Sequence, residues 1–548
     1  GPPMVTAIER PIASVINALF FRKEPYSVFR ATLVFVFLVR LYGQLRRALA
    51  RKGLRGCLAV VVVPILRRLP PVRSRLDAEL GKTLSELRAE FCQGLTQPRM
   101  TLPVEGLPPE HILDLIATRK ELDTKRWQSG KITGAVYHGQ QEHYDFIGQV
   151  FSKWAFSNPL HPGIHPALRQ MDSEVVQMVI NMYHGTPEAC GAFTTGGTES
   201  ILMAMKTYRD WGCATRGITD PNIVICHTAH AAFPKAGQYF NIHVKYARTN
   251  GKMQVDIRHM RRLIDRNTVA IVGSCCQYAH GSVDPIEELA ELAQRRRIGL
   301  HVDCCLGGFL VPFMDKAGFP LRPFDFRLKG VTSISCDPHK YGFAPKGSSV
   351  VMFASKELRR HMYSFLPGWT GGIYATPTMT GSRAGGPVAA TWASMCKFGE
   401  SGYVETTRRI VGATREIARG IQEIPELEVV GDPVVCVVAF AGRRRSGVNC
   451  YALADCMKKK FEWDLATCQN PPSIHLAVTL PSSGNAAQFL AELRQCVAEV
   501  KANAKAYTST AGLYGMAGSL PSSFVEDACA TYLDAVSEAH AQEAKAAA

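Results

Sequence analysis

The stretch VTSISCDPHK, residues 331–340, is the part of this chain from which its architecture can be worked out. Its first half, 331–335, is rich in β-branched residues and predicts a strand. The strand runs into a polar turn that carries His339 and Lys340. A lysine at the end of a strand can be partly desolvated, which lowers its pKa and lets its amine form a Schiff base. Taken alone, a lysine in a turn is more often an ordinary surface residue, so the interpretation depends on the accompanying motifs.

An acidic residue follows another predicted strand upstream. Asp303 comes directly after the run 299–302, and the carboxyl end of a strand is where α/β sheets bind ligands. A carboxylate there suits the ring nitrogen of pyridoxal phosphate, which withdraws electrons well only while that nitrogen is protonated. The plain alternative is that Asp303 caps the following helix.

Two further motifs precede Asp303. The turn TTGGTES, 194–200, opens a helical pattern, and its glycines would let the backbone and the helix N-terminus approach a phosphate. His230 follows the predicted strand 222–226 and could stack on a flat ring. Each motif also has a common structural explanation, an ordinary loop or a core or capping histidine. The order of phosphate turn, stacking histidine, strand-end acid and lysine is that of fold-type I pyridoxal-phosphate enzymes.

Short β-rich runs alternate with helical patterns from about residue 170. They lie at 222–226, 269–273, 299–302, 331–335 and 349–353, with helical segments such as 285–297 between several of them. This alternation predicts an α/β fold with a mostly parallel central sheet and helices on both faces. After about residue 400, helices at 405–424 and 486–502 flank strands within 427–440, which predicts a smaller α+β domain.

The chain is therefore predicted to have four parts. These are a basic leader at 1–70, a helical segment at 71–150, a large cofactor-binding domain at 151–400, and a small C-terminal domain with a tail at 401–548. Within the leader, the stretch at about 25–45 is apolar apart from Arg30 and Arg40. It predicts a membrane anchor if both arginines extend toward the headgroups. An interfacial amphipathic segment or an organelle-targeting presequence are the alternatives.

Most of the basic excess belongs to this leader. The chain has 63 Lys and Arg against 47 Asp and Glu, and residues 1–75 alone hold 14 basic residues and two acids, Glu9 and Glu24. A nucleic-acid-binding enzyme would spread a basic surface over its folded body, so no nucleic-acid partner is expected. The 17 cysteines are scattered and lack zinc-ribbon spacing. They predict reduced thiols in a cytosol-facing protein and no metal site.

Together the motifs resemble the group II decarboxylase-like branch of fold-type I pyridoxal-phosphate enzymes, and within it the sphingosine-1-phosphate lyases. The resemblance covers roughly residues 110–520. It rests on the blocks WAFSNPLHPGIHPALR (154–169), TGGTESILMA (195–204), AHAAF (229–233), HVDCCLGGFL (301–310), KGVTSISCDPHKYGFAPKGSS (329–349), GGIYA (371–375), GSRAGG (381–386) and YGMA (514–517).

The resemblance implies pyridoxal 5'-phosphate as the cofactor and assigns roles to residues around it. Lys340 would carry the cofactor aldehyde, Asp303 would face the ring nitrogen, and His230 would stack on the ring. The residues implied at the cofactor phosphate are Gly197, Thr198 and His339, together with Ser382 reaching across a homodimer interface.

For the substrate the resemblance implies a second group of residues. Tyr137, His161 and Lys346 would hold the substrate phosphate, with Asn158 near the substrate and Tyr514 near the site entrance. The chain also departs from the family pattern at three positions. Pro338 replaces a residue with a hydroxyl group, Cys304 replaces a small alanine, and His165 stands where an aromatic residue is usual. Pro338 puts in doubt a hydroxyl contact to the cofactor phosphate just before His339.

The activity implied is cleavage of the C2–C3 bond of a phosphorylated sphingoid base to a long-chain aldehyde and phosphoethanolamine. The resemblance also implies a homodimer with shared active sites, anchored in the endoplasmic reticulum membrane with its catalytic domain in the cytosol, although another organelle stays open. The alternative within the fold is an amino-acid decarboxylase. A scaffold without chemistry is disfavoured because Lys340 and Asp303 are both present.

Overall fold

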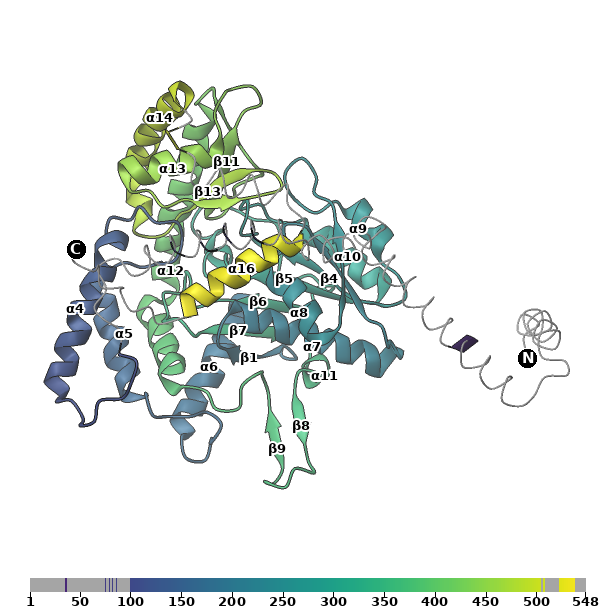
Figure 1. Cartoon of the computed structure of the whole chain (residues 1–548). Coiled ribbons are helices and arrows are strands. Elements are labelled where there is room, and N and C mark those ends of the chain that lie inside the picture. The colour runs from purple at the N-terminus through teal and green to yellow at the C-terminus, as the bar shows by residue number, and fades with distance from the viewer. Residues whose placement is uncertain are drawn as a thin grey trace, which may run out of the picture. The chain divides into compact units, whose positions relative to one another are not determined.

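The computed structural model of the chain describes residues 99–503, 506–507 and 522–537, with isolated positions at 35, 36, 74, 78, 81 and 85 (Figure 1). The chain divides into two units, Pro108–Tyr514 and a second unit formed by Gly1–Leu107 and Gly515–Ala548. In the second unit the main described element is the helix α16 (Ser522–Ser537). The predicted anchor at about 25–45 lies outside the described residues except at Phe35 and Val36. None of the helices in the described residues is both long enough and apolar enough to span a bilayer.

The larger unit is built on a 7-stranded sheet with the strand order β1-β7-β6-β5-β4-β2-β3. β7 runs antiparallel to both of its neighbours, and the other paired strands are parallel. The sheet is therefore mostly parallel, as the sequence predicts. Its strands are β1 (Cys190–Thr194), β2 (Asn222–Cys226), β3 (His243–Ala247), β4 (Thr268–Ser274), β5 (Gly299–Cys304), β6 (Ser333–Cys336) and β7 (Ser349–Phe353).

Both faces of this sheet are buried under helices. Successive side chains of a strand point to opposite faces. Ile223 and Ile225 of β2 accordingly pack in one apolar cluster with α7 (Gly197–Arg216) and α8 (Ala232–Phe240). Val224 between them packs in another cluster with residues of the helices on the opposite face. The near-continuous apolar strands follow from this two-sided burial.

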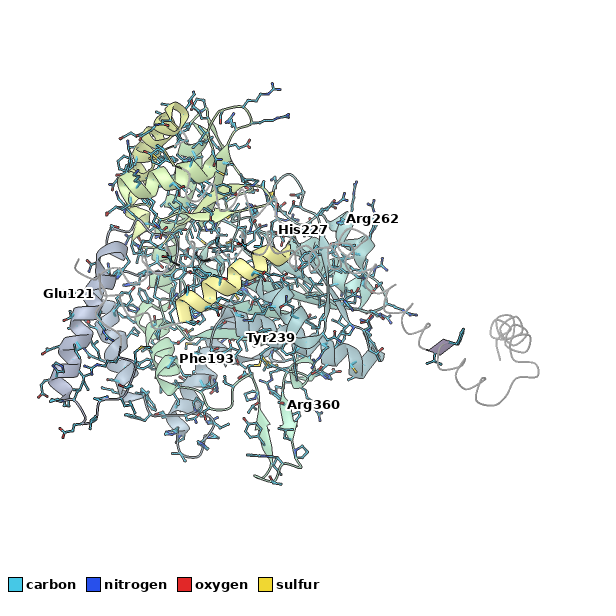
Figure 2. All side chains as sticks on the ribbon, viewed as in Figure 1. Glu121, Phe193, His227, Tyr239, Arg262 and Arg360 are labelled. Carbon is cyan, nitrogen blue, oxygen red and sulfur yellow. The ribbon has the colours of Figure 1, made fainter. Side chains whose placement is uncertain are left out.

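The remaining helices of the large domain lie around the sheet and before it in sequence. They are α4 (Pro109–Trp127), α5 (Gln141–Lys153), α6 (Pro166–Met182), α9 (Ile257–Leu263), α10 (Ile286–Arg296), α11 (Lys356–Arg360) and α12 (Gly385–Gln422), with a 3-10 turn η1 at Val311–Phe313. Charged side chains such as Arg262 of α9 and Arg360 of α11 are exposed, whereas Phe193 of β1 is buried (Figure 2). A short hairpin of β8 (Ser364–Leu366) and β9 (Tyr374–Thr376) projects beside α11 (Figure 1).

α12 crosses the predicted domain boundary near residue 400. Its backbone is interrupted at Gly399, where φ is 54° and ψ is −172°. Only glycine adopts this combination readily, so the residue permits a kink where the predicted helix 405–424 begins. The helix is longer than predicted because its first half, around Gly385, is rich in small residues that carry little apolar periodicity.

A second, 4-stranded antiparallel sheet forms the small domain, in the order β10-β11-β13-β12. Asn449 starts α13 by accepting hydrogen bonds from the backbone N–H groups of Tyr451 and Ala452. Trp463 and Phe489 are fully buried and pack edge to face at 4.9 Å. The elements are β10 (Leu427–Val429), β11 (Val437–Gly442), α13 (Cys450–Phe461), β12 (Ala466–Cys468), β13 (Ser473–Ala477), η2 (Ser482–Asn485) and α14 (Ala486–Ala502).

Candidate active site

The predicted cofactor residues follow strands of the large sheet. Asp303 lies near the end of β5, His230 follows β2, and Lys340 follows β6. The glycine turn joins β1 to α7. Because these strands point the same way, their carboxyl ends meet at one edge of the sheet, where α/β folds bind ligands.

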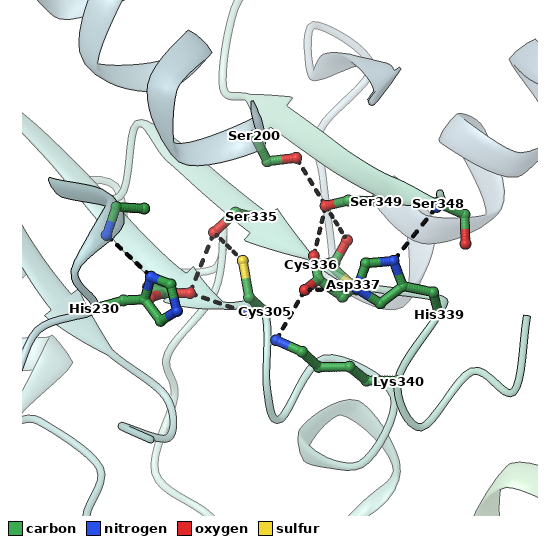
Figure 3. A network of polar contacts seen from close by, with 12 residues as sticks. Ser200, His230, Cys305, Ser335, Cys336, Asp337, His339, Lys340, Ser348 and Ser349 are labelled. Carbon is green, nitrogen blue, oxygen red and sulfur yellow. Dashed lines mark hydrogen bonds and ion pairs between the residues drawn. The ribbon is translucent and has the colours of Figure 1, made fainter. Parts of the chain in front are cut away.

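Lys340 forms an ion pair with Asp337, a residue that the sequence did not single out. Its Nζ lies 2.9 Å from Asp337 Oδ2, and the Asp337 side chain is 1% exposed (Figure 3). Burial alone would lower the pKa of Lys340, but the Asp337 carboxylate outweighs it and raises that pKa above its ordinary value. Burial alone would raise the pKa of Asp337, yet Lys340 and His339 hold it well below its usual range. The pKa of Lys340 is thus raised, whereas the sequence predicts that desolvation lowers it.

A series of hydrogen-bonded hydroxyl groups holds the Asp337 carboxylate in place. Ser349 donates to Asp337 Oδ1 at 2.6 Å, and its oxygen lies 2.8 Å from that of Ser200 on α7. The Ser200 hydroxyl lies 2.6 Å from that of Thr194 at the end of β1. The antiparallel pairing of β6 and β7 brings Ser349 next to Asp337 although the loop between the strands separates them in sequence. Figure 3 shows the contacts that run from Ser200 through Ser349 to Asp337 and on to Lys340.

Asp303 and Lys340 line one cavity of about 340 Å³. Its Oδ1 accepts the backbone N–H of Cys305 at 3.0 Å and the Ser335 hydroxyl at 3.4 Å. The second oxygen, Oδ2, has no hydrogen-bond partner among residues 99–503. These contacts fix the carboxylate at the strand end and leave one oxygen for a ligand.

The N-terminus of α7 forms the floor of a second cavity. The helix begins at Gly197 without a side-chain cap, so its first N–H groups are available. Glu199 instead braces the preceding turn, since its Oε2 accepts the N–H of Thr195 at 2.7 Å and the hydroxyl of Thr195 at 2.6 Å. This cavity of about 390 Å³ is lined by Gly197 and Thr198 together with His230, His339 and Lys340.

Lys340 lines both this cavity and the one of about 340 Å³ that contains Asp303. His230 and Cys305 also line both. The His230 ring is oriented by its Nδ1, which accepts the N–H of Ala232 at 3.1 Å. The two cavities therefore adjoin, with the lysine amine between a free carboxylate oxygen and a helix N-terminus.

Pyridoxal 5'-phosphate fits the residues of this pair of cavities. Its phosphate requires free N–H groups, its ring nitrogen an acid, and its aldehyde a lysine. The N-terminus of α7 supplies the N–H groups, Asp303 the acid and Lys340 the amine. Gly197 leaves the space open, because a Cβ at this position would lie 2.6 Å from Asp337 Oδ2 and 2.8 Å from Cys305 Sγ.

Tyr137 and Lys346, two of the residues predicted at the substrate phosphate, lie together. Lys346 Nζ is 4.8 Å from the centre of the Tyr137 ring, and Tyr137 lines the Asp303 cavity. Burial raises the pKa of Tyr137 to about 12, so its hydroxyl stays protonated and can donate. Burial and the nearby charge of Lys340 lower the pKa of Lys346.

Three other predicted residues lie apart from these cavities. Asn158 donates to the Ser382 hydroxyl at 3.1 Å, and its Oδ1 accepts the N–H of Arg383 at 3.1 Å. His161 is exposed, and neither it nor Asn158 or Ser382 lines the two cavities described above. Tyr514 lies outside the described residues. The structure therefore joins Asn158 to Ser382 but brings neither to Lys340 within one chain.

Sequence reasoning missed Asp337, Ser349 and Cys305. Asp337 stands in the quoted motif, where the sequence pattern indicates only a polar turn. Its three-residue spacing from Lys340 was the available signal, because a tight turn brings such a pair together. Ser349 could be found only with the strand register, and Cys305 only with the cavity.

Comparison with known proteins agrees with this geometry. Residues 108–443 match the family described as pyridoxal-dependent decarboxylase conserved domain. The chain is 41% identical to a sphingosine-1-phosphate lyase of Drosophila melanogaster over 93% of this chain and 94% of the relative. A solved sphingosine-1-phosphate lyase of Burkholderia pseudomallei superposes with a TM-score of 0.72 at 36% identity, covering 76% of this chain and 97% of that one.

Decarboxylases share the architecture at lower identity. A glutamate decarboxylase of Lactobacillus brevis has a TM-score of 0.64 at 20% identity, over 75% of this chain and 97% of that one, which shows the fold alone. The 41% identity to a sphingosine-1-phosphate lyase over nearly the whole length of both chains identifies the subgroup within this fold. This chain belongs to the pyridoxal-dependent decarboxylase family and, within it, to the sphingosine-1-phosphate lyases.

Proposed function

We propose that this chain is a pyridoxal-phosphate-dependent aldehyde-lyase that cleaves the C2–C3 bond of phosphorylated sphingoid bases. The products are a long-chain aldehyde and phosphoethanolamine. The observation that carries the proposal is the position of Lys340 at the junction of two cavities, with Asp303 in one and the α7 N-terminus in the other. The names of similar proteins, the Drosophila melanogaster and Burkholderia pseudomallei lyases, supply the substrate class.

The residues that would hold the cofactor follow from these cavities. Lys340 would bind its aldehyde carbon, Asp303 its ring nitrogen and His230 its ring face. Gly197, Thr198 and His339 would bind its phosphate. When bound, pyridoxal phosphate supplies a ring that stabilises negative charge at C2 of the substrate.

Lys340 is also placed to move protons. It lines both cavities, so its amine, once the substrate amine has replaced it on the cofactor, would be in place to take the proton of the C3 hydroxyl and to return a proton to C2. The backbone N–H of Cys305 holds the Asp303 carboxylate in position. In this proposal Lys340 moves the protons, and Asp303 faces the ring nitrogen.

Tyr137 and Lys346 support a phosphorylated substrate over a carboxylate one. A protonated phenol and an ammonium together offer charge-assisted hydrogen bonds to a dianion. A phosphate dianion bound beside Lys346 would raise the pKa of that lysine again. The charged lysine would in turn favour binding of the phosphate as a dianion.

The dimer and the membrane belong to the same proposal. His161, Asn158 and Ser382 lie away from the cavities of their own chain, which supports their acting at the site of a second copy. The basic, apolar leader supports anchoring in a membrane, most simply the endoplasmic reticulum, with the catalytic unit facing the cytosol. An anchored enzyme can reach a substrate that partitions into the bilayer.

The test is a product assay. Purified full-length chain with added pyridoxal 5'-phosphate is incubated with sphingosine 1-phosphate, and aldehyde and phosphoethanolamine are measured by mass spectrometry. The proposal predicts both products in equal amounts and their loss in Lys340→Ala. Carbon dioxide from an amino acid, with no aldehyde from the lipid, would assign the chain to the decarboxylases instead.

A further inference from the structure

Asp337 is the most enclosed carboxylate of the site, and the function proposed above gives it no role. Its side chain is 1% exposed and lies between three parts of the fold: the lysine turn, the start of β7 and the N-terminus of α7. The contacts are the Lys340 ammonium at 2.9 Å, the Ser349 hydroxyl at 2.6 Å and His339 Nε2 at 3.4 Å.

A buried carboxylate is stable only when it is paired and hydrogen-bonded. Ser349 holds one oxygen, and the other faces Lys340 and His339. Since Lys340 is the strongest base within reach, the pair is an ammonium and a carboxylate before any cofactor arrives. The amine that must react is therefore held in its unreactive, charged form.

Attachment of the cofactor requires the neutral amine. The Lys340 nitrogen attacks the aldehyde carbon of pyridoxal 5'-phosphate, a C=N bond forms and the aldehyde oxygen leaves as water. The proton that Lys340 gives up before its attack goes to solvent. Breaking the ion pair is thus part of loading, whereas Asp337 keeps Ser349 and His339 as partners afterwards.

We propose that Asp337 is a positioning residue for cofactor loading. It docks the Lys340 ammonium at the junction of the two cavities in the unloaded enzyme and sets the pH at which the amine becomes available. The proposal uses the cofactor of the proposed function but not its substrate, so the two can fail separately.

Other groups face the pair and contribute to its charge balance. Those from neighbouring elements are Tyr137, Cys305, Cys336, His339 and Lys346. Asp303 and His230 line the same cavity as Lys340. Among all of these, Asp337 is the one carboxylate in direct contact with the amine in the described part of the chain.

The test measures loading as a function of pH. Cofactor-free full-length chain is mixed with pyridoxal 5'-phosphate, and the rate of appearance of visible absorbance is recorded across a pH series. Asp337→Asn keeps the shape and removes the charge. Its pH midpoint should fall by about 1–3 pH units, because an opposite charge within hydrogen-bond range shifts a pKa by that much. Asp337→Glu restores the negative charge, so its pH midpoint of loading should return toward the wild-type value.

A matched control separates this effect from general loss of a buried ion pair. Asp325 is equally buried and is paired with Arg327 at 2.8 Å and with His184 at 2.9 Å. Asp325→Asn should leave the loading midpoint unchanged. An unchanged midpoint in Asp337→Asn would overturn the proposal, because a purely structural role would alter the extent of loading without moving its pH profile.

A second measurement does not require Asp337→Asn to fold. Lys340→Met removes the ammonium and leaves Asp337 without its cation. The melting temperature of the cofactor-free variant should fall further below wild type at pH 8 than at pH 5, where the carboxyl can take up a proton. An equal loss at both pH values would show that Asp337 and Lys340 are not paired in the unloaded enzyme.

Discussion

The ammonium of Lys346 lies over the ring of Tyr137, 4.8 Å from its centre, and Tyr137 lines the cavity that also contains Lys340. This pairing puts a cation and a phenol together beside the reactive amine. Under the proposed function this pair would bind the substrate phosphate, separately from the cofactor phosphate proposed at the N-terminus of α7. A second phosphate site would distinguish a phosphorylated lipid from an amino acid as substrate.

Lys346→Gln tests this relationship. We expect kcat/KM for sphingosine 1-phosphate to fall about 10- to 100-fold, because a hydrogen bond to a charged group contributes about 1.5–3 kcal/mol. Cofactor retention, measured by visible absorbance, should not change. Lys235→Gln is the control, since Lys235 makes a similar contact with the Tyr239 ring at 5.3 Å on α8, but Tyr239, labelled in Figure 2, lines neither cavity, whereas Tyr137 lines one. Equal losses in the two variants would exclude a role for Lys346 at the phosphate.

Asp303→Asn separates holding the cofactor from activating it. The amide keeps the contact to the N–H of Cys305 but loses the charge. Removing one partner of a buried charge pair costs about 3–5 kcal/mol, so we expect kcat to fall at least about 100-fold at saturating cofactor. Asp325→Asn serves as the control for losing a buried charge elsewhere. Full kcat in Asp303→Asn would show that the ring nitrogen does not depend on this carboxylate.

Gly197→Ala tests the phosphate cradle. Its Cβ would lie 2.6 Å from Asp337 Oδ2 and 2.8 Å from Cys305 Sγ, both of them in the buried floor of the site. We expect the dissociation constant for pyridoxal 5'-phosphate, measured by fluorescence titration, to rise about 5- to 150-fold, since overpacking costs about 1–3 kcal/mol. Gly412→Ala in α12 is the matched control, because its Cβ meets nothing within 4 Å. It should bind the cofactor like wild type.

His301 makes stability depend on acid pH. The ring is fully buried between the hydroxyls of Ser333 at 2.7 Å and Ser335 at 3.1 Å, and burial lowers its pKa to about 4. The unfolded chain takes up this proton near pH 6.5. The contribution of the neutral ring is therefore complete above pH 6.5 and is lost as the pH falls toward 4, by about 1.4 kcal/mol per pH unit.

Urea unfolding over this pH range checks the expectation. His301→Gln should show a shallower decrease of the unfolding free energy than wild type. His227→Gln is the control and should keep the wild-type slope, because His227, labelled in Figure 2, is exposed, and its ring stacks on that of Tyr246. If both variants kept the wild-type slope, the buried ring would not be the group that titrates.

The strongly apolar strands were predictable from the sequence, and others were not. β2 and β7 have the predicted bounds because both faces of each are buried and the runs are continuous. β1 was missed because Gly191 and Ala192 interrupt a short run, and β3 because most of its residues are only partly buried. The antiparallel direction of β7 depends on how the chain returns after Lys340, and no local pattern encodes that return.

The residues of the site also fall into those that the sequence predicts and those that depend on strand pairing. Lys340 and Asp303 were found because each ends a recognisable strand, and the geometry places them around one cavity. Asp337 was overlooked because its role depends on Ser349, a residue of the neighbouring strand that only the pairing of β6 with β7 brings into contact. Residues that act through strand register are not visible in a linear motif.

Covalent trapping tests the central claim most directly. The full-length enzyme saturated with pyridoxal 5'-phosphate is reduced with borohydride, digested and sequenced by mass spectrometry. The pyridoxyl group should be found on Lys340, at one per chain, and should be absent from Lys340→Ala. A stable adduct on another lysine such as Lys346, or none at all, would contradict the assignment of Lys340 as the reactive amine.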